Sequence, residues 1–166
     1  MVERYGSRWL KVAVLAVSVT TVLILASGGA LAAAKCKKID GSFTLQPVSA
    51  PACTAPVGVC ASGTYRGDLK GQSTFTGSSL TPTVDTPTTG VVLLTGDNLI
   101  QTSGGTLMTK DAIVLKTTGA GDFAEVDMIV GGTGEWLGVT GTLRAQGTFT
   151  SAAGGKGQYT AEICKP

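Results

Sequence analysis

The sequence contains no histidine, and only 14% of its 166 residues are charged and 5% aromatic. The absence of histidine excludes serine and cysteine triads that use an imidazole, HExxH zinc sites and the usual general base at neutral pH. Any acid–base chemistry in this chain therefore has to use carboxyl and tyrosine groups. No cofactor is expected, because no phosphate-binding or dinucleotide-binding motif occurs in a suitable structural context.

Basic residues show no excess outside the first segment of the chain. The formal net charge of +2 comes from that segment, in which Glu3 is outnumbered by Arg4, Arg8 and Lys11. From Lys35 onward ten basic residues balance ten acidic ones. A nucleic-acid partner is not expected, because such binding needs a basic surface.

Residues 12–34 carry no charge and resemble an export signal. The strongly apolar part, Val12–Ala26, has the length of a signal-peptide core, and Ala32–Ala34 supplies a small-x-small cleavage pattern. We therefore predict a signal peptide over residues 1–34, cleaved after Ala34. An uncleaved anchor is the alternative, and it would be the protein's only membrane contact.

The four cysteines all follow this segment, and an even number in an exported chain predicts two disulfides. Three pairings are possible. We favour Cys53 with Cys60, across a short loop, and Cys36 with Cys164, which would join the two ends of a closed barrel. No CxxC pair occurs, so no metal site is predicted. The expected location is secreted, periplasmic or in the cell envelope.

Glycine is abundant, with 24 residues, and threonine is frequent, which favours turns and strands over helices. A loop is predicted at Gly77–Gly90, which contains two prolines, and a turn is predicted at Gly96–Asn98. About eight short strands are expected: Ser42–Gln46, Gly63–Thr76, Val91–Thr95, Leu99–Thr102, Thr106–Lys116, Asp122–Val130, Gly141–Thr150 and Gly157–Cys164.

Sequential hairpins of this number favour an all-β fold, either an up-and-down antiparallel barrel or a sandwich. The barrel domain would comprise an N-terminal segment, residues 35–60, with the first short strand and the cysteine loop. Residues 61–166 would form the rest of the barrel.

One glycine-rich stretch carries a family resemblance. Val130–Gly141, VGGTGEWLGVTG, resembles the signature of the allene oxide cyclase and dirigent barrels. Cys53–Cys60, CTAPVGVC, is similar to an element found before the first long strand in secreted bacterial proteins with this barrel. The resemblance spans Cys53–Cys164 and implies the antiparallel barrel fold.

The activity of the family does not carry over residue by residue. Related barrels range from a cyclase to proteins that only guide radical coupling. Leu137 stands where dirigent proteins have a basic residue, and none of the cyclase's catalytic positions can be matched. Trp136, between two glycines of the motif, is predicted to plug one barrel end, with stacking on a ligand as the alternative.

Glu125 and Asp127 are the candidate catalytic pair, because both lie on one face of the strand Asp122–Val130. The opposite face is uniformly apolar, which predicts that it points inward and leaves the carboxylates in solvent. Phe123 and Ile129 on the carboxylate face keep the reverse orientation open, and a one-residue change of register would produce it. Tyr65 is a weaker candidate, expected to form part of the barrel wall.

The expected function is that of a barrel without established catalysis that holds a small apolar molecule. The alternatives are a cyclase-like, isomerase-like or dirigent-like enzyme acting on a lipid or phenolic compound, and a structural protein whose contact surface is Gly77–Gly90. The orientation of Glu125 and Asp127 distinguishes the first two.

Overall fold

The computed structural model describes residues 35–82 and 89–166. The predicted signal peptide and the centre of the predicted loop Gly77–Gly90 lie outside these ranges. Within them no helix is long and apolar enough to cross a membrane.

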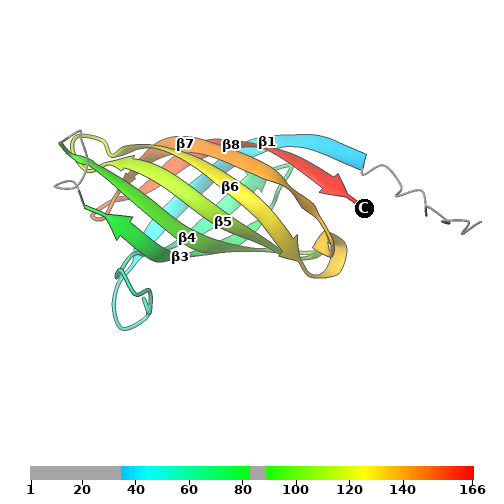
Figure 1. The fold of residues 1–166 in the computed structure, drawn as a ribbon, viewed down its shortest axis with the longest axis horizontal. Helices are drawn as coiled ribbons and strands as arrows, with labels where there is room; N and C mark the ends of the chain where they lie inside the picture. The colour runs from blue at the N-terminus through cyan, green and yellow to red at the C-terminus, as the bar shows by residue number, and fades with distance from the viewer. Residues whose placement is uncertain (1–34, 83–88) are drawn as a thin grey trace, which may run out of the picture. The chain divides into compact units, whose positions relative to one another are not determined.

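Eight antiparallel strands form a closed barrel, in which each strand pairs with its neighbours in sequence and β1 pairs with β8 (Figure 1). The all-β barrel predicted from the sequence is thereby confirmed. The strands are β1 (Lys35–Val48), β2 (Cys60–Gly67), β3 (Gly71–Thr81), β4 (Val91–Thr102), β5 (Gly105–Lys116), β6 (Asp122–Gly132), β7 (Thr140–Thr150) and β8 (Gly154–Lys165).

The predicted strand Gly63–Thr76 is two strands, because a tight turn separates β2 from β3. Gly67 has a φ of 106°, which a residue with a side chain rarely adopts. Leu69 is buried inside the turn, and its backbone N–H donates to the hydroxyl of Tyr159 on β8 at 2.8 Å. A contact from the far end of the chain therefore fixes this turn, so the local sequence pattern could not reveal it.

The predicted turn at Gly96–Asn98 is wrong, because β4 runs through it without a break. A Cβ atom on Gly96 would lie 2.4 Å from two ring atoms of Phe75 on the adjacent strand β3. Glycine is needed there to make room for a buried aromatic ring, not to reverse the chain. The prediction merged β2 with β3 into one strand and divided β4 into two. The expected number of about eight strands therefore still matches the structure.

Both predicted disulfides are present, and the described residues contain no free cysteine. Cys36 and Cys164 are cross-strand partners of β1 and β8, so their bridge joins the first and last strands of the barrel. Cys53–Cys60 links the segment of residues 49–59, which we call the Cys loop, to the first residue of β2. Loop-closure entropy gives about 5 kcal/mol for the long bridge and about 2.5 kcal/mol for the short one. Such bridges are typical of an oxidising compartment.

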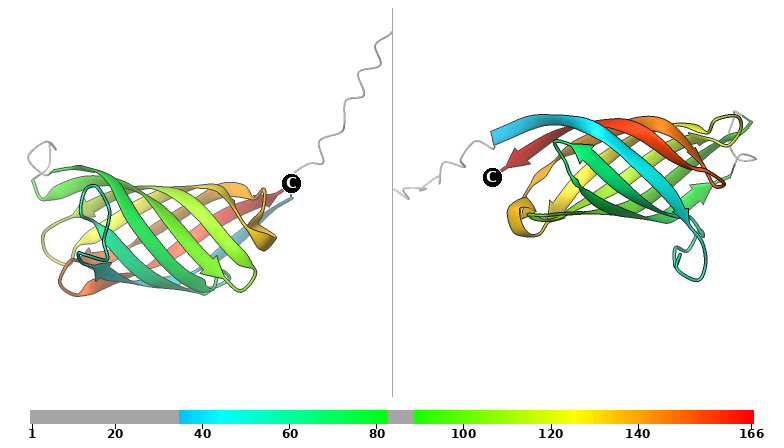
Figure 2. Two further views of the ribbon diagram at one scale, coloured as in Figure 1. Left: turned by 90° about the horizontal axis from the view of Figure 1, so that it is seen from below. Right: turned by 180° about the vertical axis from the view of Figure 1, so that it is seen from behind.

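The two ends of the barrel differ. A short 3-10 helix, η2 (Gly134–Trp136), lies at one end, and the Cys loop lies at the other (Figure 2). Trp136 is half-buried against the core, and its indole N–H donates to the hydroxyl of Thr102 at 2.8 Å. The ammonium of Lys165 lies 5.7 Å from the centre of the ring. The half of the interior nearest η2 is filled by apolar side chains, among them Ile39, Leu69, Ile100, Leu107, Ile129, Val139, Leu143 and Ile163.

Replacing Trp136 with alanine should lower the free energy of unfolding by about 3 kcal/mol, because the indole packs on the core and donates a hydrogen bond. Urea denaturation measures the change. Leu137→Ala is the matched control, since Leu137 is 74% exposed and should change stability by less than about 0.5 kcal/mol. A loss below about 1 kcal/mol for Trp136→Ala would contradict the structural role.

Candidate functional site: a buried carboxyl cluster

Strand β6 has the orientation opposite to the one favoured by its sequence. Asp127 is 1% exposed, and Phe123 and Ile129 are also buried, whereas Val126 and Met128 are 55% and 61% exposed. The prediction that the carboxylates are solvated is therefore wrong.

The reason for the error lies in the neighbouring strand. Val126 pairs with Ala112 of β5, and both side chains are exposed on the outer wall. The outer wall thus carries an apolar strip of its own, which the alternation of β6 alone cannot distinguish from a core face.

A third carboxyl group, Asp111 of β5, is brought to Asp127 by strand pairing. The two residues are direct cross-strand partners, and both are buried. One oxygen from each of Asp111, Glu125 and Asp127 lies within 4.8 Å of the others. We call these three residues the carboxyl cluster.

Asp111 and its neighbour Thr109 were not among the site residues predicted from the sequence. The positions of Lys110 and Lys116 on the same strand could have identified Thr109 and Asp111 as inward-facing. Two lysines on one face mark it as the solvent face and place Thr109 and Asp111 on the inner face.

Burial raises the pKa of each carboxyl group in the cluster, because a carboxylate loses hydration inside the barrel. The pKa of Asp111 rises from 3.8 to about 6 and that of Glu125 from 4.5 to about 8. For Glu125 the second cause is the nearby charge of Asp111. The pKa of Asp127 rises furthest, first through burial and then through the charges of Glu125 and Asp111. Asp127 is consequently protonated at neutral pH.

Hydrogen bonds order the protons within the cluster. Glu125 shares hydrogen bonds with both Asp127 and Asp111, and the hydroxyl of Thr109 donates to Asp111 at 2.5 Å. Asp127 therefore serves as a donor, Glu125 occupies the middle, and Asp111 is the terminal acceptor. Near pH 7 the negative charge resides chiefly on Asp111, while Glu125 and Asp127 hold protons.

Tyr65 forms part of the inner wall, and it also lies beside the cluster. It is 4% exposed, and its ring packs on Phe43 at a centroid distance of 5.4 Å and on Tyr159 at 5.3 Å. Burial raises its pKa well above 10, and the charges of Glu125, Asp127 and Asp111 add to the effect. The tyrosine is therefore a neutral hydroxyl at physiological pH and does not act as a base.

Asn98 of β4 is a further member of the site that the sequence analysis missed. Its side chain shares a hydrogen bond with Tyr65, it is 6% exposed, and its strand partner is Thr109. The predicted turn at this position hid Asn98, because a turn would have placed it on the surface.

Oδ1 of Asn98 is a buried oxygen in this layer without a hydrogen-bond partner. A buried acceptor without a donor is costly, by about 1 to 3 kcal/mol. Oδ2 of Asp111 and Oδ1 of Asp127 have no partner outside the carboxyl cluster, in which the protons of Glu125 and Asp127 are shared.

A cavity of about 70 Å³ lies between this layer and the Cys loop. Glu125, Asn98 and Tyr65 contribute its polar part. The remaining wall is apolar: Phe43, Leu45, Val59, Ala61, Phe75, Leu94, Ile113, Leu115, Phe123 and Phe149. The barrel therefore contains a small apolar chamber with one polar side.

The carboxyl cluster is the group of inner side chains that could hold a cation, because its oxygens are close enough to reach one ion together. Trp136 is not among the residues that line the cavity and lies at the η2 end. The structure therefore brings Tyr65, Glu125 and Asp127 together and leaves Trp136 apart from them.

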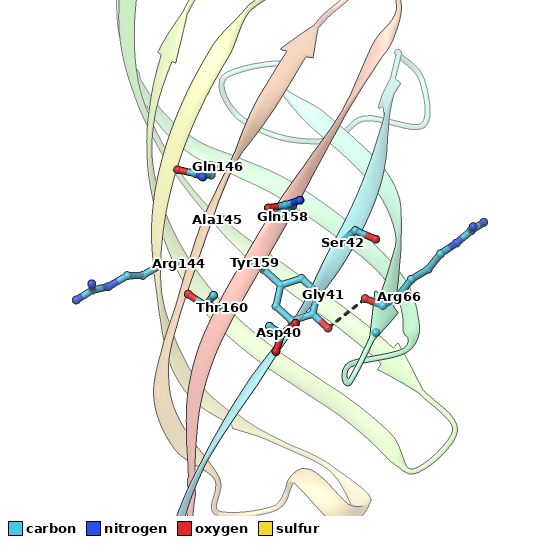
Figure 3. A pocket seen from close by; sticks show the side chains of 11 residues that line it. Asp40, Gly41, Ser42, Arg66, Arg144, Ala145, Gln146, Gln158, Tyr159 and Thr160 are labelled. Atoms are coloured by element: carbon cyan, nitrogen blue, oxygen red, sulfur yellow. Dashed lines mark hydrogen bonds between the residues drawn. The ribbon is translucent and has the colours of Figure 1, made fainter.

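A larger groove of about 700 Å³ runs along the outer wall over β1, β7 and β8 (Figure 3). Its two arginines, Arg66 and Arg144, point away from the groove in opposite directions. The hydroxyl of Tyr159 reaches the carbonyl oxygen of Arg66 beneath Gly41, where a Cβ would lie 2.5 Å from that hydroxyl. The groove exists because positions such as Gly41 carry no side chain to fill it. Its polar groups do not point toward a common centre.

Comparison of the chain with family models, with curated proteins and with solved structures finds no match.

Glu125→Gln should change the dependence of stability on pH. A carboxyl whose pKa is raised on folding stabilises the protein fully below its unfolded pKa, and this contribution is lost as pH rises through the folded pKa. For Glu125 the loss extends from about pH 4.5 to about pH 8. The variant should therefore match the wild type near pH 4 and exceed its free energy of unfolding at pH 8.5 by more than about 1 kcal/mol.

Urea denaturation at a series of pH values measures this difference. Glu162→Gln is the control, because Glu162 is exposed on β8 and should give a curve parallel to the wild type. Parallel curves for Glu125→Gln as well would show that Glu125 titrates normally.

Proposed function

We propose that this protein is an exported binding barrel that holds a small, largely apolar molecule in the chamber between the Cys loop and the carboxyl cluster. The observation that carries the proposal is the chamber itself. A barrel needed only as a structural element would be filled by side chains throughout, as the η2 half is. Here the chain places apolar side chains around a space and buried polar groups on one side of it.

The arrangement is typical of ligand sites, in which apolar walls give affinity and a few polar groups fix the orientation. The volume of about 70 Å³ corresponds to about five water-sized groups. The proposed ligand therefore has about five non-hydrogen atoms, or is a larger molecule that inserts one end.

Export and family membership belong to the same proposal. Two disulfides and the uncharged stretch of residues 12–34 support a location outside the cytoplasm. The closed eight-stranded barrel and the glycine-rich sequence around Trp136 support a relation to the allene oxide cyclase and dirigent barrels.

Ala61→Leu tests ligand binding in the chamber. Ala61 is buried and lines the cavity, so the larger side chain should occupy the space that a ligand would take. Binding of 1-butanol, measured by the protein's NMR chemical shifts at about millimolar concentrations, should fall at least about tenfold. Ala112→Leu is the matched control, since Ala112 faces outward on β5. Equal binding by both variants would place the alcohol elsewhere.

The N-terminus of the exported protein tests the location. Mass spectrometry of the product released from expressing cells should find Lys35 as its first residue, because cleavage is expected after Ala34. Recovery of the full chain in the membrane fraction would support the anchor instead.

An isomerase-like or cyclase-like enzyme acting on a lipid or phenolic compound is the second candidate, and one observation favours it. Glu125 borders the cavity, and its pKa of about 8 suits a group that exchanges a proton near neutral pH. Asp127 and Asp111 on either side would resupply and accept that proton. In such an enzyme Glu125→Gln would abolish turnover while leaving binding intact.

A further inference from the structure

The Cys loop carries a valine toward the end of the chamber. Residues 55–58 form a tight turn, in which the backbone N–H of Gly58 donates to the carbonyl oxygen of Ala55 at 2.9 Å. Gly58 has a φ of 68°, which lets the chain reverse directly after Val57. Val57 therefore lies at the tip of the turn, and its side chain is half-buried.

Strand β3 leaves room for the side chain of Val57. Ser73, Phe75 and Gly77 alternate along its buried face, so Gly77 is the next inward position beyond Phe75. A Cβ atom on Gly77 would lie 2.9 Å from Cγ2 of Val57 and 3.3 Å from Cδ1 of Leu94. Val57 thus occupies the inner side of the barrel, in the layer between Phe75 and the Cys-loop end.

The contacts of Val57 place it against the chamber. It packs on three buried side chains that all line the cavity, namely Ala61, Phe75 and Leu94. Val59, two residues further along the Cys loop, lines the cavity as well. The backbone N–H of Gly77 donates to the carbonyl oxygen of Val59 at 2.9 Å, which ties the loop to β3.

Val57 differs from the other apolar side chains at this end. Leu45, Leu115 and Phe149 belong to β1, β5 and β7, so they form the side wall of the cavity. Val57 comes from the Cys loop at the end of the barrel. It is therefore placed to close the chamber at the side opposite the polar groups of Glu125.

The bridge between Cys53 and Cys60 fixes the position of Val57. The two cysteines are seven residues apart, and Val57 lies between them. Cys60 begins β2 and is the strand partner of Thr76 on β3, so one end of this short ring is part of the barrel wall. A covalent ring of this size leaves the turn at its tip little conformational freedom.

From these features we infer that Val57 sets the length of the molecule that the chamber holds, and that the Cys53–Cys60 bridge keeps this limit in place. The ligand lies with one end at the polar side of the chamber, and its apolar end stops at Val57. The wild-type chamber then accepts about five non-hydrogen atoms and excludes longer chains. This inference rests on the proposed function, since it names the residue that limits the size of the ligand.

A series of unbranched alcohols tests the inference, because each methylene group that becomes buried tightens binding by about fourfold. In the wild type the affinity should rise from ethanol to 1-butanol and stop rising with 1-pentanol and 1-hexanol. Val57→Ala removes two carbon atoms from the end of the chamber and makes room for two more in the ligand. This variant should bind 1-hexanol at least about tenfold more tightly than the wild type does. NMR titration of the full folded protein measures the affinities.

Val114→Ala is the matched control, since Val114 is 48% exposed on the outer wall of β5 and should leave the whole series unchanged. Cys53→Ser combined with Cys60→Ser frees the Cys loop, and this variant should bind 1-hexanol more tightly than the wild type although Val57 is still present. Cys36→Ser combined with Cys164→Ser removes the other bridge and should keep the wild-type limit. If a cysteine variant does not fold, the comparison of Val57→Ala with Val114→Ala decides.

The outcomes separate the inference from the function on which it rests. If no alcohol binds to the wild type or to Val57→Ala, the proposed function fails and the inference fails with it. If the wild-type affinity keeps rising through 1-hexanol, the chamber binds ligands but is open at this end, and the inference is wrong. Identical dependence on chain length in the wild type and Val57→Ala would also overturn the inference and leave the binding site intact.

Discussion

The pairing of β1 with β8 is the interaction on which the rest of the structure depends. These two strands are the first and last of the barrel, and their pairing runs over eleven residue pairs from Lys35 to Leu45. Closure removes both free edges of the sheet and gives every strand an inner and an outer face. It also brings β8 beneath the turn between β2 and β3, where Tyr159 accepts a hydrogen bond from Leu69. Without closure that turn and the layered interior would have no support.

Much of the fold could be predicted from the sequence, because turn residues and alternation act locally. Gly119 and Gly121 mark the turn between β5 and β6, and both have positive φ values. The disulfides could be predicted from the even number of cysteines and from the closure of a barrel, which brings the two ends of the chain together. Gly96 was misread, because glycine that makes room for a neighbouring ring looks the same in sequence as glycine that turns the chain.

The site was harder to predict, because it depends on contacts between strands. Glu125 and Asp127 were identified as a pair, but the apolar residues that alternate with them along β6 suggested the wrong inner face. Asp111 belongs to the cluster only because β5 pairs with β6 in the register that places it opposite Asp127. No pattern within one strand contains that information. Asn98 was concealed in the same way, since its role depends on β4 continuing past Gly96.

The bridge between Cys36 and Cys164 has a mechanical consequence. Cys36 directly follows Lys35 at the start of β1, and Cys164 directly precedes Lys165 at the end of β8. A pull applied at Lys35 and at Lys165 would pass along the covalent bond between the two sulfur atoms. The hydrogen bonds of the eight strands, and the chamber they enclose, would bear almost none of that tension. The barrel is thus shielded from force along its own chain for as long as the bridge is oxidised.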